Sequence, residues 1–129
     1  MSENQFDKIR QLAEKTRASF NLYASMDPAS PEVTETLKKN GVAYYALYRE
    51  ITDSMNIPSE IADTPDLGMI ALAETCDDAG QTDLANQLRL YAKITVEILE
   101  EMNLPEGTCP TLAGTQAATA KIIARYPKL

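Results

Sequence analysis

Histidine is absent from the sequence, and only two cysteines occur, Cys76 and Cys109. The absence of histidine excludes a histidine-based catalytic triad and removes the commonest general base and metal ligand. Two cysteines cannot form the disulfide framework of a small secreted protein, so we expect both to be reduced thiols. The five glycines form no phosphate-binding loop. The sequence therefore predicts no metal site and no bound cofactor.

Long apolar runs are also missing. No stretch approaches the roughly 18 to 20 apolar residues of a membrane span, and the amino-terminal sequence MSENQFDKIRQLAEK is polar and unlike a secretory signal. We therefore expect a cytoplasmic protein with no membrane partner. With 129 residues, 44% of them hydrophobic, the chain is expected to form a single folded domain, residues 1–129.

Acidic side chains are concentrated in the middle of the chain. The net charge is −7, and residues 50–106 contain 13 acidic residues but only two basic ones, whereas residues 107–129 contain three basic residues and no acid. This charge argues against nucleic-acid binding. Two interpretations stay open: the acidic segment is a solvated face that keeps the protein soluble, or it mimics nucleic-acid phosphates and occupies the nucleic-acid site of another protein.

Apolar residues recur at steps of three and four, which indicates helices. Ser2 or Asn4 is the predicted N-cap of the first helix. No segment alternates with a period of two residues, so no strand is predicted. The predicted fold class is all-α, a single-domain bundle of four to five helices with short loops. The predicted helices cover residues 2–26, 30–55, 64–80, 82–102 and 110–126.

Polar residues followed by proline mark two of the predicted helix starts. Ser30 before Pro31, and Thr64 before Pro65, each combine an N-cap residue with a proline suited to the first helical position. The pair Asn40-Gly41 lies within the second segment and is compatible with a helix end. Because the apolar stripe continues beyond this pair, we predict one long helix, with a kink at the pair as the alternative.

The strings SMNIPSE and EMNLPEG mark two predicted helix ends. Asn56 and Asn103 suit the left-handed backbone of a helix terminus, and the proline two residues later cannot continue the hydrogen-bond ladder. Upstream of them, LYREIT at residues 47–52 and LYAKIT at residues 90–95 share Leu, Tyr, Ile and Thr at identical spacing. Duplication and convergent packing are both open explanations.

Residues 72–92, LAETCDDAGQTDLANQLRLYA, resemble the tetratricopeptide repeat. The resemblance implies a tightly packed helical hairpin and favours protein or peptide binding. The sequence departs from the family pattern at Arg89, where a large apolar residue is expected, and at Glu97, where the closing proline is absent. No second copy follows at the repeat length of about 34 residues. The matching positions are Leu72, Ala73, Cys76, Gly80, Ala85 and Ala92.

Two acidic pairs offer an enzymatic alternative. Glu32 with Glu35, and Glu50 with Asp53, resemble the acidic motifs of the all-α nucleotide pyrophosphohydrolases, which hold Mg²⁺ between facing helices. On one unbroken helix the two pairs would lie roughly 25 to 30 Å apart. The pairs can converge only if the chain turns at Asn40-Gly41, so this is the least favoured function.

Three tyrosines within five positions, Tyr44, Tyr45 and Tyr48, form the predicted partner-binding residues. On a helix Tyr44 and Tyr48 share one face while Tyr45 points about 100° away, so at least one should lie near the surface. Tyrosine combines contact area with a polar group, as protein interfaces require. The predicted function is a non-catalytic protein-binding module, such as an adaptor, chaperone or inhibitor, whose partner is another protein. The alternative is the acidic nucleic-acid mimic.

Overall fold

The computed structural model describes the backbone of residues 3–129 and all of their side chains except those of Glu3 and Pro65. Its helices are α1 (Glu3–Ser25), α2 (Pro31–Ser54), α3 (Ser59–Ala62), α4 (Pro65–Asp78), α5 (Thr82–Met102) and α6 (Leu112–Ile123). Residues 3–129 contain no strand, so the all-α prediction is confirmed. The predicted N-cap Ser2 lies outside the described residues, and Asn4 lies inside α1.

The prediction of four to five helices is wrong, because the described chain forms six. The additional helix is α3, a single turn that starts directly after Pro58. Pro58 does prevent α2 from continuing, yet its extended backbone also leads into a new turn. A four-residue helix is too short to show a 3.6-residue apolar stripe, which explains why the sequence pattern does not reveal it.

Most predicted helix ends lie within two residues of the observed ones, but the last helix ends at Ile123 and not just before Pro127. Thr64 is the N-cap residue of α4, as predicted, yet its side chain makes no capping hydrogen bond. The side chain of Ser30 caps α2 by accepting a hydrogen bond from the Val33 amide. Asn56 and Asn103 both adopt the left-handed backbone, with φ of 55° and 45°. The helix α2 runs through Asn40-Gly41 without a break, as predicted.

The repeated strings have the same local structure. Thr52 donates a hydrogen bond of 3.0 Å to the carbonyl oxygen of Tyr48, and Thr95 donates one of 2.9 Å to the carbonyl oxygen of Tyr91. LYREIT lies in the second half of α2 and LYAKIT at the middle of α5, and a left-handed asparagine follows the end of each helix. Duplication and convergent packing both account for this similarity.

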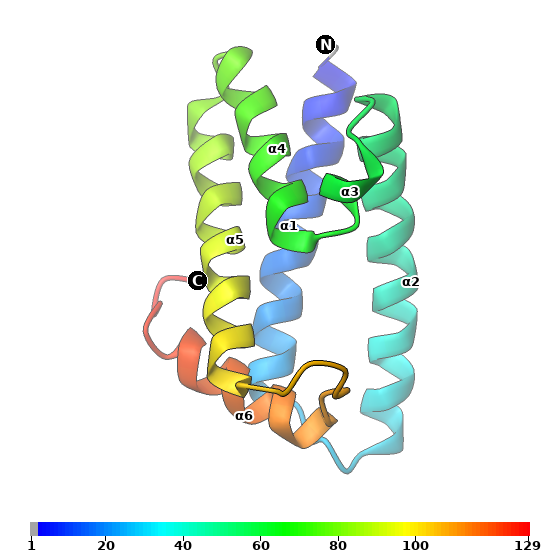
Figure 1. The fold of residues 1–129 in the computed structure, drawn as a ribbon, viewed down its shortest axis with the longest axis vertical. Helices are drawn as coiled ribbons and strands as arrows, with labels where there is room; N and C mark the ends of the chain where they lie inside the picture. Colours follow the sequence, from blue (N-terminus) through cyan, green and yellow to red (C-terminus); the bar gives the residue numbers. More distant parts are fainter. Residues whose placement is uncertain (1–2) are drawn as a thin grey trace.

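Figure 1 shows α1 at the centre of the bundle, between α2 and α5, with α6 across its lower end. α5 packs mainly against α4, whereas α1 packs against α6, α2 and α5. α3 and α4 lie in front of the upper half of α1, but none of the drawn helices lies in front of its lower half above α6 (Figure 1). The fourth position of the bundle is therefore filled over only part of its length.

The hydrophobic core is continuous through α1, α2, α4, α5 and α6. In α1 the buried residues recur at steps of three and four, the spacing from which the helix is predicted. They are Phe6, Ile9, Leu12, Ala13 and Thr16. The largest fully buried side chains are Tyr91, Ile9, Leu12, Ile51, Leu72, Leu88, Ile94 and Ile122.

Candidate functional site

The three predicted partner-binding tyrosines lie in α2 at different depths. Tyr48 is 6% exposed, Tyr44 is half-buried and Tyr45 is 57% exposed. The expectation that at least one of them lies near the surface is confirmed by Tyr45. The guanidinium carbon of Arg49 lies 5.6 Å from the centre of the Tyr45 ring, a cation–π contact that orients this exposed side chain.

Tyr48 connects α2 to α3 and α4. Its hydroxyl donates a hydrogen bond of 2.5 Å to the carbonyl oxygen of Ala62, and a Cβ placed on Gly68 would lie only 1.8 Å from its hydroxyl oxygen. The Tyr44 ring stacks on the Tyr48 ring with centroids 6.3 Å apart, and a 3.3 Å hydrogen bond joins the hydroxyl groups of Tyr44 and Thr16. Tyr44 and Tyr48 thus hold helices together, and their part in partner binding stays a prediction.

Along its length α2 changes from buried to weakly packed. Among residues 31–47 the core contacts come from Tyr44 and Leu47, which are only partly buried, and we call this half unpartnered. The buried residues of α2 are Tyr48, Ile51 and Thr52, and residues 31–47 include no buried side chain. The exposed face of this half carries Val42, which is 74% exposed, beside Tyr45. Apolar side chains this exposed on one helix face are typical of a surface that another molecule covers.

A groove of about 560 Å³ separates the C-terminal half of α1 from the N-terminal half of α2, and we call it the α1–α2 groove. It lies where the fourth position of the bundle is empty, and Thr95 of α5 contributes to its wall. Most of its lining is apolar or small. The lining residues are Lys15, Thr16, Ala18, Ser19, Phe20, Leu22, Tyr23, Leu37, Asn40, Gly41, Ala43, Tyr44 and Thr95.

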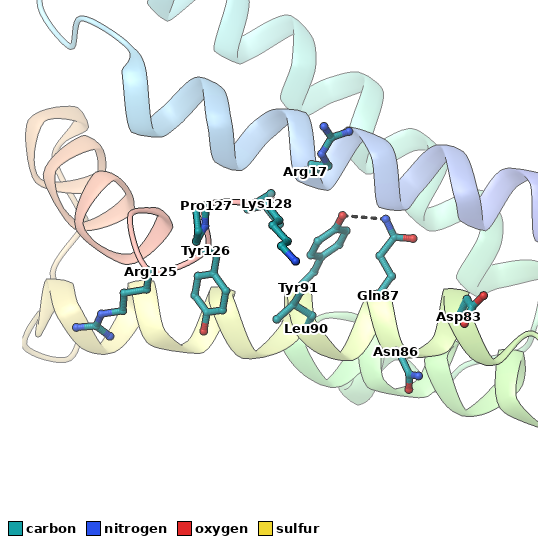
Figure 2. Close-up of a pocket in the computed structure, with 11 residues that line it drawn as sticks. Arg17, Asp83, Asn86, Gln87, Leu90, Tyr91, Arg125, Tyr126, Pro127 and Lys128 are labelled. Atoms are coloured by element: carbon teal, nitrogen blue, oxygen red, sulfur yellow. Dashed lines mark hydrogen bonds between the residues drawn. The ribbon is translucent and has the colours of Figure 1, made fainter.

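A second groove, of about 740 Å³, lies between α5, α1 and the C-terminal residues 125–129. Figure 2 shows Lys128 extending toward Tyr91, whose hydroxyl accepts a 2.9 Å hydrogen bond from Gln87, while Arg125 points away from the groove. Its basic side chains are largely satisfied inside the protein, since Arg17 pairs with Glu14 and Arg125 with Glu97. The sequence pattern does not predict this groove because the C-terminal segment forms one wall.

The acidic pairs of the pyrophosphohydrolase resemblance do not converge. Because α2 is continuous, Glu32 and Glu35 at its start are separated from Glu50 and Asp53 at its end by roughly 27 Å along the axis. The structure therefore lacks the arrangement that this resemblance requires. Among the side chains that the structure describes, no group of three or more carboxylate, cysteine or histidine side chains lies close enough to hold a metal ion.

The α4–α5 hairpin has the geometry that the tetratricopeptide resemblance implies. Gly80, with φ of 79°, makes the turn, and the other matching residues are buried between the two helices. The departure at Arg89 has a local explanation, because Arg89 forms an ion pair with Asp77 across the hairpin. The hairpin is confirmed as local geometry, whereas a peptide-binding role based on this likeness stays a prediction.

Two buried acidic groups give the protein a pH-dependent stability. Burial raises the pKa of the Cys76 thiol from 9.0 to about 11, with Asp77 adding to the shift, and burial raises the pKa of Tyr48 from 10.0 to about 12, with Tyr44 adding to it. At a pH between the ordinary and the raised pKa of each group, the folded protein retains a proton that the unfolded chain has lost. Stability should therefore be fully present below pH 9 and decrease as the pH rises from 9 to 12.

Urea denaturation at pH 8 and at pH 10.5 checks this expectation. The unfolding midpoint should be lower at the higher pH, and Cys76→Ala should make the difference smaller because it removes the buried thiol. A midpoint that does not change between the two pH values would show that these groups ionise freely in the folded state.

The fold and its surfaces define a small all-α bundle with one long helix that is half unpartnered and with surface grooves that include the two described above. None of the described helices is long and apolar enough to cross a membrane. Comparisons with protein-family models, with curated proteins and with solved structures find no match to this chain. The function therefore has to be inferred from the geometry of the surface.

Proposed function

We propose that the protein is a non-catalytic protein-binding module, such as an adaptor, chaperone or inhibitor, that binds its partner with the N-terminal half of α2. The single observation that carries the proposal is that residues 31–47 form four to five helical turns without a buried side chain. Most of the stability of a helix in a protein comes from packing of its apolar face, so an unpartnered half is a surface suited to a partner. The cytoplasmic location predicted from the sequence is part of this proposal.

Tyr45 and Val42 are the contacts we expect to matter most. Tyr45 is exposed and oriented by Arg49, so that little side-chain freedom remains to be lost when a partner binds. Such exposed aromatic residues frequently dominate binding energy. Loss of the Tyr45 ring should therefore weaken partner binding strongly, whereas loss of Tyr48 should mainly affect the fold.

Photo-crosslinking in the source cell tests the proposal. Benzoylphenylalanine placed at position 45 should give one defined covalent adduct with another protein, and the adduct should disappear when Val42→Asp is added. The matched control carries the same cross-linker at Glu74, which is exposed on α4. Equal adducts from positions 45 and 74, or none from position 45, would contradict a binding surface on α2.

The acidic nucleic-acid mimic remains a second candidate. It is favoured by the carboxylates of residues 50–106, because only Glu50, Asp63, Asp77, Glu97 and Glu101 among them form ion pairs within the described part of the chain. Under this function a partner would be a nucleic-acid-binding protein, and an oligonucleotide would displace the protein from it. Displacement should then be lost when acidic residues outside α2 are neutralised.

A further inference from the structure

We propose that the α1–α2 groove binds an amphipathic helix of the partner protein, whose apolar stripe enters the groove and whose flanking residues are acidic. This inference rests on the proposed function and names the partner segment for the groove face of the same helix half, beside the exposed face that carries Val42 and Tyr45. The groove is bounded by the unpartnered half of α2 on one side and lies where the bundle lacks its fourth helix. A helix bound there would complete the packing around the lower half of α1.

The dimensions of the groove fit a short helical segment. Its lining extends from Lys15 to Tyr23 along α1 and from Leu37 to Tyr44 along α2, which corresponds to roughly 10 to 12 Å of helix. Three apolar side chains at positions i, i+4 and i+7 of a bound helix span about the same length. The groove therefore accommodates a helix of about three turns that inserts three apolar anchors.

The lining residues suit contact with another helix. Phe20, Tyr23 and Tyr44 provide aromatic surface on which apolar side chains can pack. Small residues along both walls, Ala18 and Gly41 among them, leave room for a second backbone to approach closely. At Gly41 a Cβ would meet no atom within 4 Å, so the wall is open at this point.

The charge of the groove determines the chemistry of the occupant. The lining residues include one basic side chain, Lys15, and no carboxylate, although the whole protein has a net charge of −7. Lys15 forms no ion pair with any described residue. Its ammonium group can pair with a carboxylate that flanks the apolar stripe of a bound helix.

The distant acidic residues do not cancel this local preference. At physiological ionic strength the Debye length is about 8 Å, so a bound helix responds mainly to the charges beside it. Lys15 therefore favours an acidic flank on the bound helix, even though the protein is acidic as a whole. The expected partner segment has an apolar stripe between glutamate or aspartate residues.

Fluorescence anisotropy with designed peptides tests the inference. The probe is a labelled 14-residue helix-forming peptide with leucines at i, i+4 and i+7 and glutamates on both flanks. Its matched control has lysine in place of every glutamate. The acidic peptide should bind at least about tenfold more tightly than the basic one, and its affinity should decrease as the salt concentration rises.

Two kinds of variant locate the binding site on the full chain. Gly41→Leu should fill the groove and abolish binding while leaving the helix content and the urea midpoint at least as high, because leucine is a better helix former than glycine. Lys15→Glu should weaken binding by about tenfold without filling the groove. The charge control is Lys128→Glu, at a lysine outside this groove, which should bind like the wild type.

The outcomes separate this inference from the proposed function. Three results would contradict an acidic helix as the occupant of the groove. The basic peptide could bind more tightly than the acidic one, the acidic peptide could fail to bind, or Gly41→Leu could bind the acidic peptide as tightly as the wild type. Binding of a single-stranded oligonucleotide to Lys15 in preference to the peptide would contradict the acidic helix as well. If the cross-link from position 45 persists in those cases, the protein-binding module stands and only the nature of its partner segment is wrong.

Discussion

Replacement of Leu88 by alanine is expected to lower the free energy of unfolding by about 2–4 kcal/mol. Leu88 is fully buried in α5, in the continuous core that joins this helix to α1 and α4. Removal of one methine and two methyl groups loses their transfer free energy and leaves a cavity that rigid neighbouring helices cannot close completely. In a domain of this size such a loss removes a large share of the total stability.

The control for Leu88→Ala is Pro105→Ala, at an exposed position in the loop after α5. Asn103, two residues before Pro105, ends the helix by its left-handed backbone, and alanine retains the carbonyl at position 105 that accepts a hydrogen bond from the Thr108 amide. Pro105→Ala should lower the free energy of unfolding by less than about 1 kcal/mol, mainly because alanine gives the unfolded chain more conformational freedom. Urea denaturation of both variants measures these changes in the free energy of unfolding. Equal decreases for Leu88→Ala and Pro105→Ala would contradict the position of Leu88 in the core.

Gly68→Ala is expected to destabilise the protein by about 1–3 kcal/mol, although alanine normally stabilises a helix relative to glycine by about 1 kcal/mol. Gly68 is buried in α4, and its new Cβ would lie 1.8 Å from the hydroxyl oxygen of Tyr48. The tyrosine must then move and give up its hydrogen bond to Ala62, which leaves a buried carbonyl group without a partner.

Gly41→Ala provides the matched control, because it makes the same substitution in another helix where a Cβ meets nothing within 4 Å. Gly41→Ala should stabilise the protein, so that the two glycine variants change the free energy of unfolding in opposite directions. Tyr48→Phe removes the oxygen that clashes with residue 68, and in that background Gly68→Ala should cost at least about 1 kcal/mol less. Additive effects in the double-mutant cycle would show that Tyr48 does not lie against Gly68.

The helix boundaries could be predicted because each depends on a few adjacent residues. Ser30 caps its own helix through an amide three residues later, and Asn103 ends its helix through its own backbone angles. The all-α class could be predicted for the same reason, since a 3.6-residue stripe is local information. The single turn α3 could not, because four residues are too few for a periodic pattern.

The candidate site could be predicted only in part. Helical geometry alone requires that Tyr45 face away from Tyr44 and Tyr48, and the structure agrees. The burial of Tyr48 depends on Gly68, which lies twenty positions away in another helix and has no local link to the tyrosine cluster. The α1–α2 groove likewise depends on where α4 begins relative to α1, which is a property of the three-dimensional arrangement and not of any single segment.

The packing of α1 against α6 has a consequence for biosynthesis. α1 is made first, yet the helix it packs against most extensively, α6, begins only at Leu112. At roughly 5–20 residues per second, translation requires about 5 to 20 s to proceed from the end of α1 to the end of α6. During this time the apolar face of α1 that later contacts α6 is exposed on the ribosome, where general chaperones can bind it. The α4–α5 hairpin, by contrast, can form as soon as its own residues have emerged.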